Sequence, residues 1–173
     1  ETSYLYAPLA HRLGLYTIKT ELEDLSFKFT YPNEYDVIKN KLEKTKAVRD
    51  RYILKFSHPI KKELDNHGFK YQFKARTKSI PSIHRKMQDK GVDFEEVFDV
   101  FAIRIILDSI DEKADCWKVY SVVTDYYIPN PERLRDWISY PKQNGYESLH
   151  TTVMSPTGKW VEVQIRSKRM DDI

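Results

Sequence analysis

Apolar residues in the first 67 positions recur every three or four residues, with charged residues between them. This periodicity predicts two short helices over residues 3–29 and a longer helical stretch that starts at Pro32. Pro32 suits the first turn of a helix, where its missing N–H costs no hydrogen bond. Pro59 should kink or end the longer stretch, because proline removes one hydrogen bond of the helix and clashes with the preceding turn. We therefore expect residues 1–67 to form a helical segment.

From residue 69 the pattern changes to strict alternation. Residues 69–76 alternate aromatic or apolar side chains with polar and basic ones, which predicts a strand with one basic face. Ser79 and Pro81 then suit the N-cap and the first turn of a helix. Residues 99–108 are a nearly continuous apolar run bounded by aspartates, which is the pattern of a buried central strand.

The rest of the chain predicts one more helix and three more strands. A helix is expected over residues 111–127 and a strand over 160–166. Between them, residues 136–154 predict a strand, a tight loop broken by Pro141 and Gly145, and a second strand with alternating polarity. The order of elements predicts a mixed β-sheet with two covering helices, of class α/β or α+β, on a helical appendage.

Bulk properties are those of a globular protein and restrict its partners only weakly. The chain has 173 residues, 32% of them charged, and a net charge of +3, which does not by itself argue for nucleic acid. Its single cysteine, Cys116, excludes an internal disulfide and a cysteine-rich zinc site, and we expect a buried structural thiol. No apolar run of membrane-spanning length and no signal-peptide pattern is present, so we expect a cytoplasmic protein without membrane contact.

Basic residues converge where the first strand meets the following helix. A helix start offers free N–H groups and a positive dipole end, and Ser82 adds a hydroxyl, so this corner suits a polyphosphate. The alternative is a solvated basic face, which most helices can carry. The cations of this corner are Lys74, Arg76, Lys78, Arg85 and Lys86.

The loop and second strand within residues 136–154 carry a cation, an amide, an aromatic ring, a hydroxyl and an imidazole. That combination suits a ligand with phosphates and a flat ring, although a decorated hairpin turn is the alternative, because Asn-Gly is a common turn dipeptide. The residues are Lys142, Asn144, Tyr146, Ser148 and His150.

Three charged residues on predicted strands need an explanation. Arg104 interrupts a buried strand and therefore needs a carboxylate or a phosphate as partner. Asp99 and Glu162 lie among the phosphate-binding cations, which suggests magnesium-assisted phosphoryl chemistry. The alternatives are a capping role for Asp99 and a surface position for Glu162. No Walker A pattern is present, which excludes a P-loop enzyme.

Together these residues resemble the RelA/SpoT family, with motifs in the family's order along nearly the whole chain. The motifs are Tyr6-Ala-Pro-Leu-Ala-His-Arg-Leu-Gly14, Glu21-Leu-Glu-Asp-Leu25, Arg76-x-Lys78, Ser82-Ile-x-Arg-Lys-Met87, Asp99 with Ala102-Ile-Arg104, Pro141-Lys-x-Asn-Gly-Tyr-x-Ser-x-His-Thr-Thr-Val153 and Val161-Glu-Val-Gln-Ile-Arg166.

The resemblance implies a (p)ppGpp synthetase with a nucleotidyltransferase-like fold, an ATP:GTP 3′-diphosphotransferase. Such domains move pyrophosphate from ATP to the 3′-hydroxyl of GDP or GTP and release AMP. Residues 68–173 would be this domain, truncated at its C-terminus. Residues 1–67 would be the end of the helical bundle that links it to a missing hydrolase domain. Contacts with the ribosome and tRNA would occur only through missing domains.

The resemblance also implies roles for single residues. Asp99 and Glu162 would bind Mg²⁺, with Mn²⁺ as an alternative, and Glu162 would activate the 3′-hydroxyl. Tyr146 would stack on guanine. The ATP-binding residues would be Arg76, which stacks on adenine, and Lys78, Lys86 and Arg104 on the phosphates. The residues that bind GDP or GTP would be Ser82, Arg135, Lys142, Asn144, Tyr146 and His150.

The sequence departs from the family pattern at Ala75, where glycine is usual, and at His84 and Trp137, where other aromatic residues are usual. None of the five histidines precedes an aspartate, so the His-Asp pair of the family's hydrolase is absent and hydrolysis of (p)ppGpp is not expected. A catalytically degenerate domain that binds nucleotides and controls a neighbouring hydrolase is the main alternative. An RNA-binding module, suggested by basic residues near aromatic ones, is a third.

Overall fold

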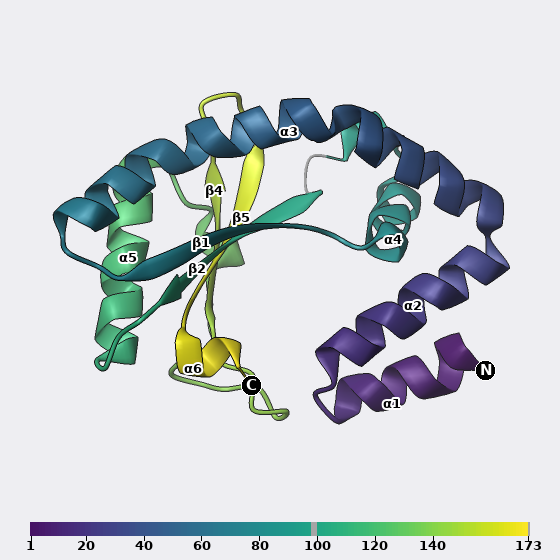
Figure 1. Cartoon of the computed structure of the whole chain (residues 1–173), viewed down its shortest axis with the longest axis horizontal. Helices are drawn as coiled ribbons and strands as arrows, with labels where there is room; N and C mark the ends of the chain where they lie inside the picture. Colours follow the sequence, from purple (N-terminus) through teal and green to yellow (C-terminus); the bar gives the residue numbers. More distant parts are fainter. Residues whose placement is uncertain (98–99, 173) are drawn as a thin grey trace. The chain divides into compact units, whose positions relative to one another are not determined.

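The computed structural model describes residues 1–97 and 100–172, and the chain forms two compact units (Figure 1). Unit 1 comprises Glu1–Arg49 and Lys78–Val100, and unit 2 comprises Asp50–Thr77 and Phe101–Ile173. These units are defined by contacts and do not test the predicted boundary between residues 67 and 68, which stays a prediction. Among the helices of the described residues, none is both long and apolar enough to cross a membrane.

Unit 1 is helical. Its elements are η1 (Thr2–Tyr6), α1 (Ala7–Arg12), α2 (Tyr16–Thr30), the first half of α3 (Pro32–Asn66), α4 (Ile80–Lys90) and η2 (Phe94–Glu96). Helix α3 begins at Pro32, as predicted. Its Ile38 packs with Ile83 of α4 and Phe94 of η2 in a buried core. Helix α4 begins as predicted from the N-cap Ser79, whose hydroxyl accepts a hydrogen bond from the backbone N–H of Ser82.

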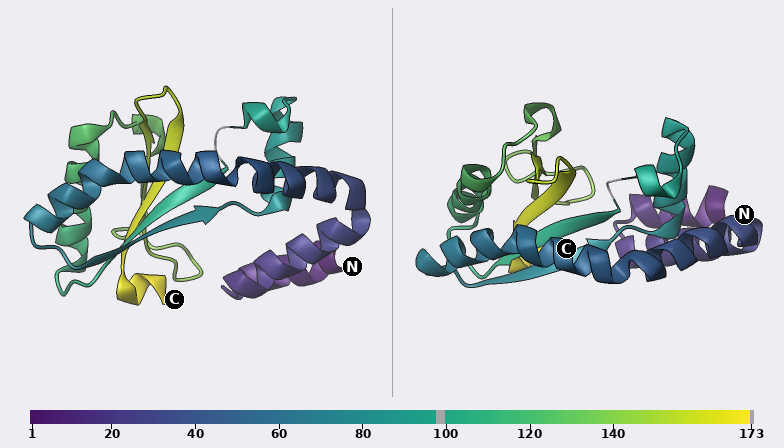
Figure 2. Two further views of the ribbon diagram at one scale, coloured as in Figure 1. Left: turned by 45° about the horizontal axis from the view of Figure 1, so that its top comes forward. Right: turned by 90° about the horizontal axis from the view of Figure 1, so that it is seen from above.

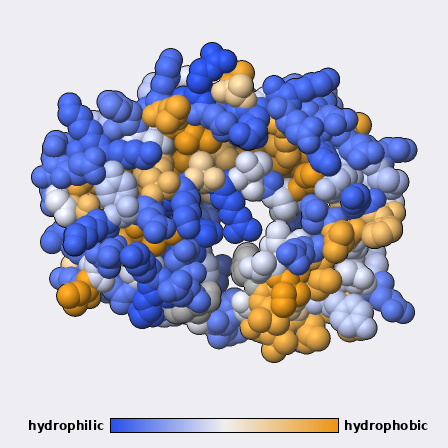
Figure 3. All heavy atoms as spheres, viewed as in Figure 1, coloured by the Kyte–Doolittle hydropathy of each residue, from blue (hydrophilic) through white to orange (hydrophobic). Residues whose placement is uncertain are grey.

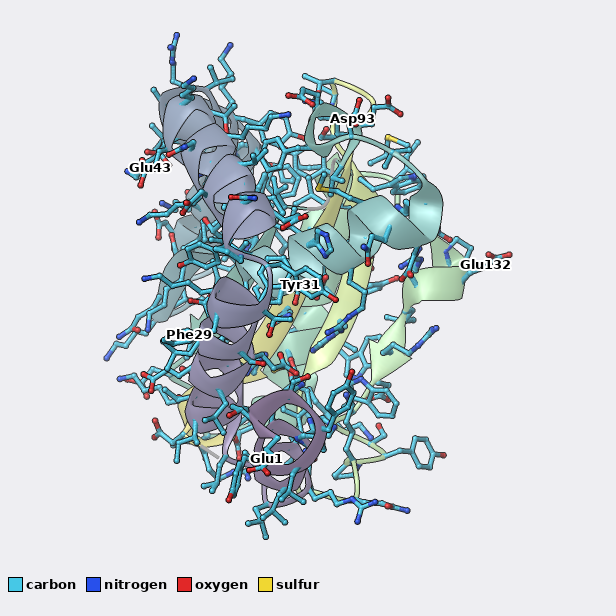
Figure 4. All side chains as sticks on the ribbon, turned by 90° about the vertical axis from the view of Figure 1, so that its right-hand side faces the viewer. Glu1, Phe29, Tyr31, Glu43, Asp93 and Glu132 are labelled. Atoms are coloured by element: carbon cyan, nitrogen blue, oxygen red, sulfur yellow. The ribbon has the colours of Figure 1, made fainter. Side chains whose placement is uncertain are left out.

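Aromatic rings join α2 to α4 within unit 1, and other apolar side chains of this unit remain at the surface. Phe27 and Tyr31 pack against His84 of α4, with ring centroids 4.8 Å and 6.2 Å away. Figure 4 shows Tyr31 beside α4. Phe29, in contrast, is 85% exposed. Figure 3 shows hydrophobic side chains at the surface over α1 and α2. The exposed residues include Tyr4, Leu5, Leu9, Leu13 and Leu25.

Unit 2 is built on a five-stranded mixed sheet in the order β1-β2-β5-β4-β3. Its strands are β1 (Tyr71–Thr77), β2 (Phe101–Leu107), β3 (Arg135–Asp136), β4 (Leu149–Met154) and β5 (Trp160–Ser167). Strands β2 and β5 pair in parallel, and all other neighbours pair antiparallel. Figure 2 shows the chain from two further directions. The unit also contains the rest of α3, α5 (Glu112–Tyr126), η3 (Pro131–Arg133) and α6 (Lys168–Asp171).

One face of this sheet is apolar and forms the core of unit 2. Ile103, Ile105, Val163 and Ile165 occupy alternate positions of β2 and β5 and are fully buried. Helix α5 and residues 50–66 of α3 supply the facing apolar residues, and the ring of Phe56 stacks on Tyr127 with centroids 4.4 Å apart. Cys116 of α5 is buried in this region, as predicted. The mixed sheet with covering helices confirms the predicted fold class.

One expectation from the sequence is excluded in part, and another is wrong. Helix α3 does not end at Pro59 but continues to Asn66, because Ile60 and Leu64 in the turns that follow are fully buried, and the alternative that Pro59 kinks the helix stays a prediction. Burial of this apolar stripe outweighs one missing hydrogen bond. The first strand of the predicted hairpin is only the two-residue β3, and a turn begins directly after it. Asp136 causes the turn, because its Oδ1 accepts hydrogen bonds from the backbone N–H groups of Ile138 (3.1 Å) and Ser139 (2.9 Å).

Candidate active site on the polar face of the sheet

The polar face of the sheet in unit 2 carries three of the predicted site residues, Arg104, His150 and Arg135, in one row. The strand register places Lys74, Arg104, Gln164, His150 and Arg135 next to one another on β1, β2, β5, β4 and β3. Residues that face each other across neighbouring strands point to the same side of a sheet. The sheet therefore brings residues from five separate strands to one surface.

Strand β5 supplies three polar residues to this face at alternate positions. Glu162 and Gln164 are half-buried, with the Glu162 side chain 24% exposed, and Arg166 is 4% exposed. Val161, Val163 and Ile165 point to the core between them, as the alternation in the sequence predicted. The core thus fixes the direction of all three polar side chains.

The polar residues of β5 form a closed circuit with Tyr146 and His150. Nη2 of Arg166 donates to the hydroxyl of Tyr146 (2.6 Å) and to Oε1 of Gln164 (2.7 Å). Nε2 of Gln164 donates to Oε1 of Glu162 (2.8 Å). The hydroxyl of Tyr146 lies 2.7 Å from Nε2 of His150, and Nδ1 of His150 lies 3.9 Å from Oε1 of Glu162. The predicted guanine platform and the predicted catalytic acid therefore belong to one network.

Two features of this network set its charge. An arginine can only donate, so the Tyr146 oxygen accepts from Arg166. The Tyr146 hydroxyl and His150 Nε2 share a hydrogen bond whose direction depends on the tautomer of the imidazole. The pKa of His150 is lowered to about 4. Burial is the largest cause, the nearby cations Arg166 and Lys142 lower the pKa further, and Glu162 opposes them. The imidazole is therefore neutral at pH 7.

The loop before β4 has a defined geometry that presents Tyr146. The backbone N–H of Lys142 donates to the carbonyl of Tyr146 (3.0 Å), and the N–H of Gly145 donates to the carbonyl of Lys142 (2.9 Å). Gly145 has a φ of +83°, a backbone angle that residues with a side chain rarely adopt, so this position favours glycine. Oδ1 of Asn144 accepts from the N–H of Tyr146 (3.1 Å). Asn144 therefore shapes the loop, and its predicted contact with the acceptor nucleotide stays a prediction.

Cations lie against the ring of Tyr146. Nζ of Lys142 is 5.1 Å from the ring centroid and 5.0 Å from that of Trp137, and Cζ of Arg166 is also 5.1 Å from the Tyr146 centroid. His150 meets the same ring edge to face, with centroids 5.7 Å apart. Positive charge and a flat aromatic surface thus coincide, which suits a ligand that carries both a base and phosphates. Arg135 lies further along the row and is exposed, and its Nη1 donates to the carbonyl of Glu132 (2.8 Å).

Arg104, the cation in the buried strand, has the partner that the sequence called for, and that partner is a carboxylate. Its Nη1 lies 3.2 Å from Oδ1 of Asp171, and Nη1 of Arg166 lies 3.5 Å from the same oxygen. Helix α6, capped by Ser167, places Asp171 there directly after β5. Nε of both arginines is buried without a hydrogen-bond partner among the described residues. Two guanidinium groups on one carboxylate oxygen leave donors available to an added anion.

The other predicted nucleotide-binding residues are divided between the two units. Arg76 lies exposed on β1 in unit 2, with Arg104 on the neighbouring strand. Lys78, Ser82 and Lys86 belong to unit 1, where Ser82 Oγ lies 2.8 Å from Ser79 Oγ at the start of α4. The use of these residues for a common ligand stays a prediction.

The departure from the family pattern at Ala75 does not strain the backbone. Ala75 lies within β1 opposite Ile103, and no described residue other than glycine has a positive φ. Alanine therefore fits the strand at this position without unusual torsion angles.

Of the two predicted metal ligands, only Glu162 lies within the described residues. Glu162 offers a carboxylate, the oxygen donor that Mg²⁺ prefers, whereas its predicted partner Asp99 lies outside the described residues. Within residues 1–97 and 100–172 there is no group of three or more His, Cys, Asp or Glu side chains that could hold a metal. The donor chemistry of Glu162 fits a magnesium ion, and the complete ligand set stays a prediction.

Sequence reasoning assigned no site role to three residues that build this network. Arg166 and Gln164 were placed on the same face as Glu162 by the alternation of β5, and that spacing was the available signal. Nothing in the sequence pattern pointed to Asp171, because its role depends on α6 turning back toward β2 and β5.

Comparisons with known proteins show which sequences this chain is similar to. The family model described as "Region found in RelA / SpoT proteins" matches residues 75–173. A guanosine-3′,5′-bis(diphosphate) 3′-pyrophosphohydrolase of Aquifex aeolicus is 41% identical over 173 residues, which cover 99% of this chain and 24% of the relative. A GTP pyrophosphokinase of Escherichia coli is 41% identical over 172 residues, which cover 99% of this chain and 23% of the relative. The chain thus spans about a quarter of the length of these curated relatives.

A solved structure supports the fold. The small alarmone synthetase 1 from Bacillus subtilis matches with a TM-score of 0.53 and 22% sequence identity, over 79% of this chain and 74% of that chain. This likeness shows that the two chains share their fold. The family model covers more than half of the sequence, and the chain belongs to the RelA/SpoT family.

Proposed function

We propose that this chain is a (p)ppGpp synthetase domain, which transfers pyrophosphate from ATP to the 3′-hydroxyl of GDP or GTP. The observation that carries the proposal is the circuit on the polar face of the sheet, in which Glu162 and Tyr146 are joined through Gln164, Arg166 and His150. A carboxylate can take the proton of an attacking hydroxyl, and nearby cations can stabilise the charge that develops on a nucleotide phosphate.

In this proposal the acceptor nucleotide lies against Tyr146. Its guanine stacks on the Tyr146 ring, and Lys142 attracts its phosphates from the position 5.1 Å from that ring. His150 is neutral and already holds the Tyr146 hydroxyl, so it orients the ring rather than supplying charge. The RelA/SpoT pattern also assigns Ser82, Arg135 and Asn144 to this nucleotide.

The transfer needs a base for the 3′-hydroxyl and cations for the ATP phosphates. Glu162 takes the hydroxyl proton as the 3′-oxygen forms a bond to the β-phosphorus of ATP and the bond to the α-phosphate oxygen breaks, which releases AMP. Arg104 binds the phosphates through the N–H groups that Asp171 leaves available. The RelA/SpoT pattern also assigns Arg76, Lys78 and Lys86 to ATP. Mg²⁺ held by Glu162 and Asp99 would draw electron density from the phosphates.

The experiment is incubation of the chain with ATP, GDP and Mg²⁺, followed by separation of the nucleotides. Equimolar AMP and ppGpp support the proposal. Tight GDP binding without turnover would instead support the alternative, a regulatory domain that binds nucleotides without catalysis. The relatives include enzymes named as hydrolases, so a parallel incubation with ppGpp is needed. Release of pyrophosphate from ppGpp would contradict the assignment as a synthetase alone.

A further inference from the structure

The side-chain amide of Gln164 has only one orientation that satisfies both of its neighbours. Arg166 donates to the amide oxygen at 2.7 Å, and the amide nitrogen donates to Glu162 Oε1 at 2.8 Å. Because a guanidinium has no acceptor, the oxygen must face Arg166 and the nitrogen must face Glu162. An amide turned by 180° would direct its oxygen at the carboxylate and its nitrogen at the guanidinium. Arg166 therefore determines which atom of Gln164 faces Glu162.

The same nitrogen atom of Arg166 also holds Tyr146. Nη2 donates to the phenol oxygen at 2.6 Å, and the guanidinium carbon lies 5.1 Å from the ring centroid. This distance is that of a strong charge-assisted hydrogen bond. One atom is thus shared between the aromatic ring and the amide that contacts Glu162.

Arg166 is itself held in place. It is 4% exposed, and Nη1 lies 3.5 Å from Oδ1 of Asp171. Ile165 and Ser167, its neighbours on β5, point to the other face of the sheet and are fully buried or nearly so. A buried guanidinium with this support cannot move without breaking several contacts at once.

From this geometry we infer that Arg166 is a positioning residue, which fixes the ring of Tyr146 directly and the carboxylate of Glu162 through Gln164. The inference rests on the proposed function, since it gives the acceptor platform and the proton acceptor a common support. Arg166 and Gln164 touch no reacting atom in this arrangement. They act by holding Tyr146 and Glu162 in a fixed relation, and supports of this kind typically change activity about 10–100-fold.

Two substitutions separate the branches of this support. Gln164→Met keeps the length and volume of the side chain and removes the amide, so it cuts the branch to Glu162. It should lower kcat about 10–100-fold and leave the Kd for GDP within about threefold. Arg166→Lys keeps the positive charge, but a lysine has no planar fork to bridge Tyr146 and Gln164. It should lower kcat by a similar factor and also weaken GDP binding about tenfold or more.

The double variant tests whether Arg166 acts on Glu162 through Gln164. If it does, kcat of the double variant equals that of Gln164→Met within about threefold, because the branch is already cut. Losses of kcat that multiply would overturn the inference. Gln72→Met is the matched control, since Gln72 is exposed on β1 opposite Ile106. It carries the same chemical change on the same face of the sheet and should leave both kcat and Kd unchanged.

A readout independent of turnover separates this inference from the proposed function. In protein labelled with ¹⁵N, the side-chain amide resonance of Gln164 is assigned by its loss in Gln164→Met. Arg166→Lys should shift this resonance and leave that of Gln72 unmoved. An unshifted Gln164 resonance would overturn the inference whether or not the parent protein makes (p)ppGpp. A shifted resonance in a parent without synthetase activity would support the positioning role and reject the proposed function alone.

Discussion

The phenol oxygen of Tyr146 lies 2.7 Å from Nε2 of His150, and the two rings meet at an interplanar angle of 85°. The loop that carries Tyr146 and the strand that carries His150 are thereby fixed to each other. Burial keeps His150 neutral, with a pKa of about 4, so a ring nitrogen can accept a hydrogen bond from the Tyr146 hydroxyl at neutral pH. The Tyr146 ring is consequently held at a defined angle before any nucleotide arrives.

Tyr146→Ala should weaken GDP or GTP binding far more than ATP binding. A base stacked on an aromatic side chain contributes roughly 1–3 kcal/mol, a range measured for single-stranded nucleic acids. Isothermal titration calorimetry with each nucleotide gives the two affinities. Tyr140→Ala is the matched control, because Tyr140 precedes the same loop and is largely exposed. Equal losses for ATP and GDP would remove Tyr146 from the role of guanine platform.

Ile165→Ala should destabilise unit 2 by about 2–5 kcal/mol, because it leaves a cavity in the fully buried face of β5. Ile110→Ala, at a fully exposed position, should change the free energy of unfolding by less than about 0.5 kcal/mol. Urea unfolding of the two variants provides the comparison. Similar values for both would show that the apolar face of the sheet is not the core of this unit.

Cys116 should be unreactive toward thiol reagents in the folded protein. Burial raises the pKa of its thiol from about 9 to about 12, with Glu112 and Asp115 adding to the shift. The unfolded thiol ionises near pH 9, so ionisation favours unfolding above that value, and stability should fall as the pH rises from about 9 to about 12. Reaction with an aromatic disulfide, followed by absorbance, should occur only after denaturant is added. Rapid reaction of the folded chain would contradict burial of Cys116.

Pro59→Ala should stabilise the protein. Proline is about 3 kcal/mol less favourable than alanine inside a helix, and Pro59 lies inside α3 with helix on both sides. The half-buried proline ring makes contacts that alanine loses, so we expect a net gain of about 1–2 kcal/mol in the free energy of unfolding. Thermal or urea unfolding measures it. A loss of stability would mean that the ring contacts outweigh the missing hydrogen bond.

Periodicity in the sequence predicted the elements that carry the site. It missed features that depend on contacts between residues far apart in the sequence. The alternation of β5 placed Glu162, Gln164 and Arg166 on one face, as the structure confirms. Ser79 predicted the start of α4 through its capping chemistry. In contrast, the continuation of α3 past Pro59 depends on burial against residues distant in sequence, which local propensity does not contain.

The partner of Arg104 illustrates the same limit. A cation in a buried strand implies a counter-charge, and the sequence left a carboxylate or a phosphate open. Asp171 lies 67 residues away and meets Arg104 only because β2 and β5 are parallel neighbours. The circuit through Tyr146 likewise depends on the fold, since Arg166 is 20 residues away from Tyr146. Pairing between strands created these contacts.

The most direct test of the synthetase assignment is the rate of ppGpp formation by the parent chain and by Glu162→Gln. The amide keeps the size of the side chain, so folding and nucleotide affinity should survive, with Glu43→Gln on an exposed turn of α3 as the control. Loss of a positioned general base should lower kcat about 10²–10⁴-fold. We expect equimolar AMP and ppGpp from the parent and from the control, and this loss of kcat in Glu162→Gln. A variant rate within about threefold of the parent would contradict it.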